Sequence, residues 1–148
     1  MWPYYPDMLA RSVPRYTSYP TAAEFTPAHN VQAQETALAQ VGADASLSLY
    51  VHIPFCRTIC WYCGCNTGAA GHATRRAAYV DALLQEIAMV SARLEGRGQV
   101  ASIHFGGGSP NALPVSEVAR IVEALRGSFA GTDRAQLDME LDPRGLDK

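Results

Sequence analysis

The chain has 148 residues, of which 48% are hydrophobic and 18% are charged, and its formal net charge is −2. This length and composition are typical of one globular domain with a real core, and they exclude a disordered chain. Because Lys and Arg form no run, the charge pattern gives no indication of a nucleic-acid partner.

The first 45 residues are expected to form an extended arm and a helix ahead of a domain at 46–148. Residues 1–25 are rich in Pro and Tyr and show no helical or strand periodicity. The chain begins without an apolar stretch long enough for a signal peptide or a membrane span, so no membrane partner is expected. Thr26 and Pro27 then suit the start of a helix and Gly42 its end, which predicts a helix over about 27–41.

Strands and helices alternate in the rest of the chain. Periodicity predicts strands at 47–53, 100–105 and 137–142, a helix over 74–94 and a second helix that begins at Pro114 and ends at Gly127. The order strand, helix, strand, helix, strand predicts an α/β fold with a parallel sheet and right-handed crossovers.

The predicted strands carry apolar and polar side chains on alternate positions, whereas a parallel strand buried on both faces should be almost continuously apolar. If the apolar set packs on the helices, the polar set faces a shared interior, which would be a ligand cavity. An open sheet with one solvated face would show the same alternation. The apolar set is Leu47, Leu49, Val51, Ile53, Ala101, Ile103, Phe105, Leu137, Met139 and Leu141, and the polar set is Ser48, Tyr50, His52, Ser102, His104, Asp138, Glu140 and Asp142.

All 4 cysteines lie within residues 56–65, directly after the first predicted strand. The C-x3-C-x2-C spacing of Cys56, Cys60 and Cys63 lets a short loop bring three thiolates to one iron–sulfur cluster. Cys65 could in principle be a fourth ligand, although ligation together with Cys63 would be strained. Zinc is an alternative, but its usual two ligand pairs, a dozen or more residues apart, are not present. A disulfide is another, but the cysteines are bunched and the chain lacks secretory features, so reduced cysteines in the cytoplasm are expected.

Two other candidate elements follow the carboxyl ends of predicted strands, where α/β folds place their reactive groups. They are the glycine run at 106–110 and the segment 142–144. A glycine run by itself is weak evidence, because it could be only a turn, and Glu140 could be only a solvated carboxylate. Three elements on one rim, counting the cysteine loop, are stronger evidence for a ligand site than any one of them.

These motifs resemble a known family. YVHIPFCRTICWYCGCNT at 50–67 and PRYTSYPTAAEF at 14–25 are similar to oxygen-independent coproporphyrinogen III oxidases of the radical S-adenosylmethionine (radical SAM) superfamily, over about residues 11–148. The resemblance implies the first half of a partial (β/α) TIM-like barrel, truncated after its third strand, with the N-terminal arm wrapped around it. It also implies a [4Fe–4S] cluster ligated by Cys56, Cys60 and Cys63, with SAM on the remaining iron.

The resemblance further implies which residues contact SAM, and it implies two SAM molecules in each full-length member. Ser109 stands where the family has Thr, and both supply a hydroxyl. Cys65 is not a ligand in that family, and His52 could be merely a hydrogen-bonded strand residue, so both roles stay open. The implied SAM contacts are Tyr50, Tyr62, Gly107, Gly108, Ser109 and Glu140, of which Tyr62, Gly108 and Ser109 match positions that contact the second SAM.

The implied reaction is the oxidative decarboxylation of two propionates of coproporphyrinogen III to vinyl groups, which gives protoporphyrinogen IX for haem synthesis. The expected partners are coproporphyrinogen III and an electron donor. Because the family's chains are far longer, the hypothesis is a fragment that cannot turn over its substrate alone and that needs a separate chain to complete the barrel. The alternatives are a non-catalytic iron–sulfur or haem-binding module, an inactive remnant, and a radical SAM enzyme with another substrate, which PRYTSYPT argues against.

Overall fold

The computed structural model describes residues 6–9 and 24–146. The chain divides into two compact units, Met1–Gln34 and Glu35–Lys148, so the division falls ahead of the boundary at 45/46 that the sequence predicts. Most of the predicted N-terminal arm lies outside the described residues. Within it, Pro6–Leu9 forms a short helix, α1, where the sequence predicts none.

Helix α2, Val31–Ala39, begins later than the predicted 27–41. Thr26 closes a turn instead, because its carbonyl accepts a hydrogen bond from the His29 backbone at 2.9 Å. The side chain of Asn30 then accepts from the Ala33 N–H at 3.1 Å, which is the bond that an N-cap residue makes. The predicted start of this helix is therefore wrong, and Asn30 is its cap.

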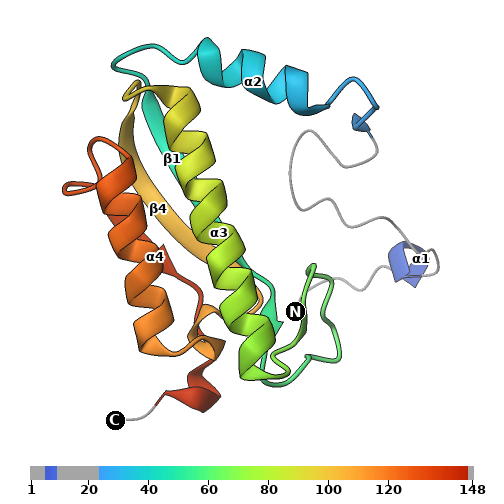
Figure 1. Ribbon diagram of the computed structural model, residues 1–148. Helices are drawn as coiled ribbons and strands as arrows, with labels where there is room; N and C mark the ends of the chain where they lie inside the picture. The colour runs from blue at the N-terminus through green and yellow to red at the C-terminus, as the bar shows by residue number, and fades with distance from the viewer. Residues whose placement is uncertain (1–5, 10–23, 147–148) are drawn as a thin grey trace. The chain divides into compact units, whose positions relative to one another are not determined.

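A three-stranded parallel sheet lies at the centre of the second unit, in the order β1-β4-β5. Its strands are β1 (Ser46–Ile53), β4 (Gln99–Gly107) and β5 (Gln136–Met139). Helices α3 (Ala73–Leu94) and α4 (Val115–Ser128) lie side by side over one face of this sheet (Figure 1). The predicted order of elements and their parallel pairing are confirmed.

Shorter elements connect these layers at the ends of the strands. A second, two-stranded parallel sheet is formed by β2 (Phe55–Cys56) and β3 (Gly68–Ala69), neither of which the sequence predicts. The 3₁₀ helices η2 (Pro110–Ala112) and η3 (Pro143–Gly145) follow β4 and β5. All of these elements lie just after the carboxyl ends of the three main strands.

The core lies between the sheet and the two long helices. Apolar side chains of β1 and β4 alternate inward, as predicted, and they meet the inner stripes of α3 and α4. This burial removes apolar surface from water and is the main favourable contribution to folding. The core includes Val51, Ile53, Ile103, Phe105, Val80, Ile87, Ile121 and Leu125.

Two parts of the predicted apolar set are wrong. Ala101 is exposed, because the register between β1 and β4 shifts after Leu47 and places Val100 in the core instead. On β5, Leu137 is 44% and Leu141 is 50% exposed, since β5 ends at Met139 and forms the outer strand of the sheet.

The polar face of the sheet is solvated in the described part of the chain. Tyr50 is 59% exposed, and His104 and Glu140 are also substantially exposed. Of the two arrangements that the alternation allowed, the one observed is therefore the open sheet with a solvated face.

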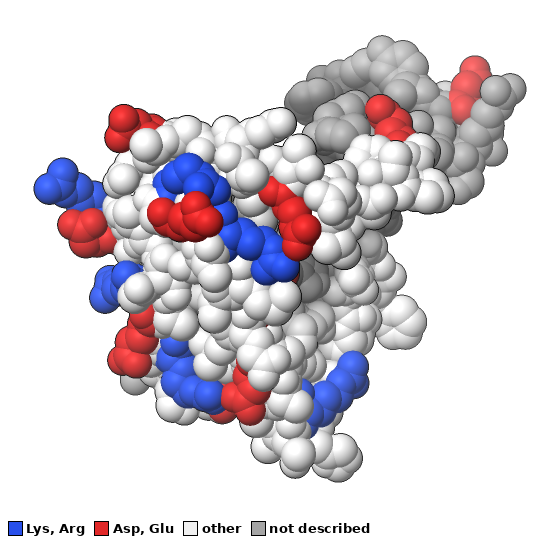
Figure 2. Space-filling model, turned by 45° about the horizontal axis from the view of Figure 1, so that its top comes forward, with Lys and Arg blue, Asp and Glu red and all other residues white. Residues whose placement is uncertain are grey.

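Charged side chains of both signs are interspersed on the surface that Figure 2 draws. Several of the described arginines lie beside carboxylates. The Arg120 guanidinium is 2.8 Å from Asp81 and 3.1 Å from Glu117, and that of Arg93 is 2.9 Å from Glu35. No helix among the described residues combines the length and the apolar character needed to cross a membrane.

Candidate functional site

The cysteine loop leaves the end of β1 and returns beside its own start. The Gly68 N–H donates to the Pro54 carbonyl at 2.8 Å, and the Ala70 N–H donates to the Cys56 carbonyl at 2.8 Å. These bonds pair β2 with β3 and close the loop at its base. Within it, the Cys63 N–H donates to the Cys60 carbonyl at 3.0 Å, which turns the chain between these two cysteines.

The four cysteines of this loop form no disulfide and differ in exposure. Cys56 is buried, Cys60 is partly buried, and Cys63 and Cys65 are exposed. In the part of the chain that the structure describes, no three His, Cys, Asp or Glu side chains are grouped as a single metal ion would require. A tetrahedral zinc site would need such a group, whereas an iron–sulfur cluster spreads its cysteines over separate irons.

Cys65 lies close to Cys63 at the exposed side of the loop. Loss of hydration raises the pKa of the Cys65 thiol, and the neighbouring Cys63 and Glu140 raise it further. Both effects disfavour the thiolate of Cys65. Loss of hydration destabilises any charged form, and the nearby negative charges repel another one.

The glycine loop that follows β4 is clamped against the start of the cysteine loop. The Gly108 N–H donates to the Ile53 carbonyl, and the Ser109 N–H donates to the Phe55 carbonyl, both at 2.8 Å. A Cβ atom at Gly108 would lie 2.6 Å from the Phe55 carbonyl oxygen, and one at Gly107, where φ is +105°, would lie 2.5 Å from the His52 ring. Only glycine allows this approach, so the run is more than a turn.

A row of polar side chains crosses the solvated face of the sheet. The Tyr50 ring stacks on that of His104, with 5.8 Å between centroids and 12° between planes. His104 Nε2 lies 3.2 Å from Glu140 Oε1. Partial loss of hydration is the largest cause that raises the pKa of the Tyr50 hydroxyl, and the negative charge of Glu140 raises it further. Side chains of β1 and β4 therefore meet the residue that follows β5 here, and Tyr50 and Glu140 are both among them.

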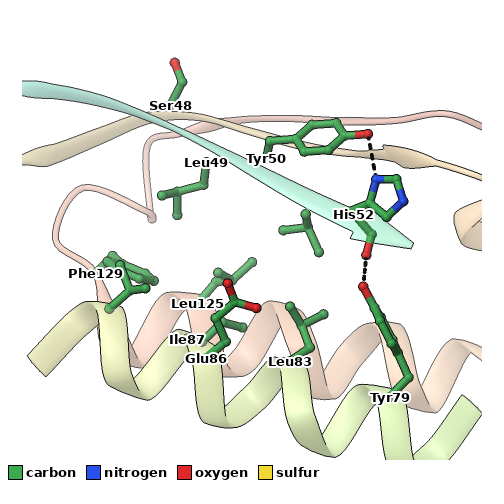
Figure 3. Close-up of a pocket in the computed structure, with 12 residues that line it drawn as sticks. Ser48, Leu49, Tyr50, His52, Tyr79, Leu83, Glu86, Ile87, Leu125 and Phe129 are labelled. Atoms are coloured by element: carbon green, nitrogen blue, oxygen red, sulfur yellow. Dashed lines mark hydrogen bonds between the residues drawn. The ribbon is translucent and has the colours of Figure 1, made fainter. Parts of the chain in front are cut away.

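His52 connects this row to the cysteine loop. Its Nε2 lies 2.9 Å from the Asn66 carbonyl. Its Nδ1 lies 3.3 Å from the Tyr50 hydroxyl, as Figure 3 shows. Because a carbonyl oxygen can only accept, Nε2 carries the hydrogen, and Nδ1 accepts from Tyr50 in the neutral ring. The role that the sequence left open for His52 is thus to hold the far side of the cysteine loop against β1.

The segment after β5 is the third element of this rim. Asn111 donates from Nδ2 to the Asp142 carbonyl at 2.9 Å and accepts from the Asp142 N–H at 3.0 Å. The Asp142 carboxylate accepts two bonds from the Arg144 guanidinium, both at 2.8 Å. These bonds lower the pKa of the Asp142 carboxyl group. The Asp142 carboxylate, and to a smaller extent Cys60, raises the pKa of Arg144. Arg144 therefore lies beside the cysteine loop.

The structure brings together most of the residues predicted for the site. The cysteine loop, Gly107, Gly108, Ser109, Tyr50 and Glu140 all lie at one end of the sheet. Tyr62 is 78% exposed, so the loop does not bury it against them. The sequence included Arg144 in the candidate segment 142–144 and Thr67 as the last residue of the motif at 50–67, but it assigned neither a role. It did not single out Asn111, which belongs to no periodic pattern and reaches the site only through the fold.

A separate groove of about 260 Å³ lies between β1 and α3 (Figure 3). Tyr79 donates from its hydroxyl to the His52 carbonyl at one end of it, and the Glu86 side chain points into it. Most of its lining is apolar, including Leu83, Ile87 and Leu125. It contains none of the cysteines or glycines of the rim.

The sequence matches the model of the radical SAM superfamily over residues 50–141. Because this match covers more than half of a chain whose fold and cysteine loop agree with it, the chain belongs to the radical SAM superfamily. Membership implies a [4Fe–4S] cluster and SAM as cofactors. The residues fit such a cluster, since soft cysteine sulfurs lie on one loop and two of them lie beside hydroxyl groups.

The relatives narrow the family further. The chain is 42% identical over 134 residues to the oxygen-independent coproporphyrinogen III oxidase of Bradyrhizobium diazoefficiens and 41% identical over 136 residues to that of Escherichia coli. These matches cover 90% and 92% of this chain but 30% and 29% of the relatives. A relative from Mannheimia haemolytica with the same name is 40% identical over 132 residues, which is 89% of each chain.

A solved structure agrees with these matches. The Escherichia coli coproporphyrinogen III oxidase, described as a radical SAM enzyme, superposes with a TM-score of 0.80 and 35% identity, over 98% of this chain and 32% of that one. The chain is thus a member of the oxygen-independent coproporphyrinogen III oxidase family. It spans about 30% of the length of the first curated relatives that it matches, and its fold corresponds to the N-terminal portion of the radical SAM barrel.

Proposed function

We propose that this chain is the cluster-binding N-terminal portion of an oxygen-independent coproporphyrinogen III oxidase, in which Cys56, Cys60 and Cys63 ligate a [4Fe–4S] cluster. The observation that supports this most strongly is the clamp between the two loops, where Gly108 and Ser109 donate to Ile53 and Phe55. The clamp holds bare backbone next to the cysteine loop, and backbone polar groups next to a cluster can bind the polar end of a cosubstrate.

The remaining residues of the rim then bind SAM. Gly107 and Gly108 offer backbone groups without side-chain obstruction, and Tyr50 and Glu140 offer a hydroxyl and a carboxylate from the polar face. Tyr62 and Ser109 would contact a second SAM molecule. When bound, the cluster and SAM supply the radical chemistry by which two propionates of coproporphyrinogen III, each losing carbon dioxide, become the vinyl groups of protoporphyrinogen IX.

Turnover in this proposal requires more protein than the residues described. The polar face is solvated, and β5, the outer strand of the sheet, presents an edge that no described strand pairs. A completing chain or segment would pair with that edge and enclose the face, and an electron donor would serve the cluster. We place this function in the cytoplasm, because a cluster needs cysteines kept reduced.

Anaerobic reconstitution with iron and sulfide tests the cluster. The reduced protein is expected to give a [4Fe–4S] electron paramagnetic resonance (EPR) signal that changes when SAM is added. Single Ser variants of Cys56, Cys60 and Cys63 should each lose this signal, whereas Cys65→Ser, in the same loop, is the matched control and should keep it. A signal that survives Cys60→Ser, or that needs Cys65, would contradict the assignment.

A second assay separates the fragment from a non-catalytic module. The loaded chain, given SAM, a reductant and coproporphyrinogen III, should form no protoporphyrinogen IX by itself. Adding the remaining portion of a family member should restore product formation. If SAM is never cleaved and haem binds stoichiometrically instead, the chain is a cofactor-binding module.

A further inference from the structure

Two hydroxyl side chains outside the C-x3-C-x2-C spacing each meet one of its sulfur atoms. The Thr67 hydroxyl lies 3.5 Å from Cys63 Sγ, and the Ser109 hydroxyl lies 3.8 Å from Cys56 Sγ. The two hydroxyls come from different segments of the chain, the return of the cysteine loop and the glycine loop.

The backbone holds each of these donors in place. The Thr67 N–H donates to the Cys65 carbonyl at 2.9 Å, directly before β3 begins. Ser109 is fixed by the bond from its N–H to the Phe55 carbonyl, one residue before Cys56. Such support is what a positioned donor requires, since a mobile side chain would spend most of its time in water.

The direction of these bonds follows from the chemistry of the ligands. A cysteine that ligates iron has lost its proton, so its sulfur can only accept a hydrogen bond. The hydroxyls of Thr67 and Ser109 must then donate. Reduction adds negative charge that spreads onto the sulfurs, and a donor beside them stabilises the reduced form more than the oxidised form. Hydrogen bonds to the sulfurs are among the features that set cluster potentials.

We propose that Thr67 and Ser109 are positioning residues that each hydrogen-bond one ligand sulfur and together raise the reduction potential of the cluster. The inference rests on the proposed function, because it takes Cys56, Cys60 and Cys63 as the ligands. It assigns Thr67 a role that the cysteine spacing does not contain, and it gives Ser109 a task that is separate from contact with SAM.

A potentiometric titration followed by EPR, on the reconstituted full chain without SAM, tests the proposal. Thr67→Val and Ser109→Ala should each lower the reduced-to-oxidised ratio at a fixed potential about threefold, or about 28 mV for one electron. Ser48→Ala removes a hydroxyl whose described partner is not a sulfur, and it should leave the potential unchanged.

Conservative variants separate hydrogen bonding from packing. Thr67→Ser and Ser109→Thr keep the hydroxyl and should retain most of the reduction potential. The proposal fails if these variants shift the potential as far as Thr67→Val and Ser109→Ala do.

The unsubstituted protein allows a test that needs no variant. Its Fe–S(Cys) Raman bands should shift on transfer to D₂O, and unshifted bands would overturn the inference. If the unsubstituted chain takes up no cluster, the proposed function fails and the inference with it. A cluster with the same potential in all variants refutes the inference alone.

Discussion

Gly108→Ala tests the clamp between the glycine loop and the cysteine loop without any cofactor. The new methyl group would lie 2.6 Å from the Phe55 carbonyl oxygen and 2.9 Å from that of Ile53. Both are backbone atoms, so one loop must move, and the 2.8 Å bonds donated by Gly108 and Ser109 would be lost or weakened. Two bonds at about 1 kcal/mol each, with about 1–3 kcal/mol for the overlap, predict a loss of about 3–5 kcal/mol.

Urea denaturation of the cluster-free chain, followed by circular dichroism, measures this loss as a lower transition midpoint. Gly127→Ala is the matched control, because a Cβ there meets nothing within 4 Å and Gly127 lies in α4. Alanine is a better helix former by about 1 kcal/mol, so the control should be neutral or slightly stabilising. If Gly108→Ala lies within about 0.5 kcal/mol of the unsubstituted chain, the range of ordinary surface changes, the loops are not clamped as described.

Three further changes follow from the described contacts. Asn111→Ala should lower the free energy of unfolding in urea by about 1–3 kcal/mol, because it removes both hydrogen bonds to the Asp142 backbone. An unchanged free energy of unfolding would show that these two bonds are not formed. Ile121→Ala, at a fully buried site, should cost about 2–5 kcal/mol, whereas Val115→Ala, at 86% exposure on the same helix, should cost under about 0.5 kcal/mol; equal losses would contradict the assigned faces of α4. The Arg144 bonds lower the pKa of Asp142 from 3.8, so their stabilising effect should be complete above about pH 4 and lost as the pH falls through the folded pKa. Asp142→Asn should abolish that part of the acid dependence of unfolding, and an unchanged profile would refute the pairing.

The sequence predicts the layers of this fold well, because they depend on local periodicity. The stripe of Val80, Ile87 and Leu94 marks α3, and the alternation from Leu47 to Ile53 marks β1. Both patterns report which face of an element is buried, and the burial of that face determines the core. The grouping of the cysteine loop, the glycine loop and the segment 142–144 was predictable for a related reason, since each follows the end of a parallel strand.

The errors occur where a choice depends on long-range contacts. Thr26 and Asn30 are both good N-cap residues, and only the hydrogen bonds show that Asn30 caps α2. A period of two gives no sign of the extra residue at Ala101, because the shift is a property of the pair of strands. Thr67 reaches the sulfur of Cys63 only through the return of the cysteine loop, which no local pattern contains.

The solvated polar face has a consequence for how the proposed activity would be controlled. His104 and Glu140 form a pair whose side chains are 43% and 53% exposed, and exposed pairs contribute at most about 1 kcal/mol. If protein covered this face, water would leave and the effective dielectric constant would fall, so the same charges and hydroxyls would act more strongly on anything bound beside them. Under the proposed function, the electrostatic effect of Tyr50 and Glu140 on bound SAM would therefore depend on enclosure. We therefore expect cofactor binding and catalysis to be separable, with the first a property of the described residues and the second a property of the completed barrel.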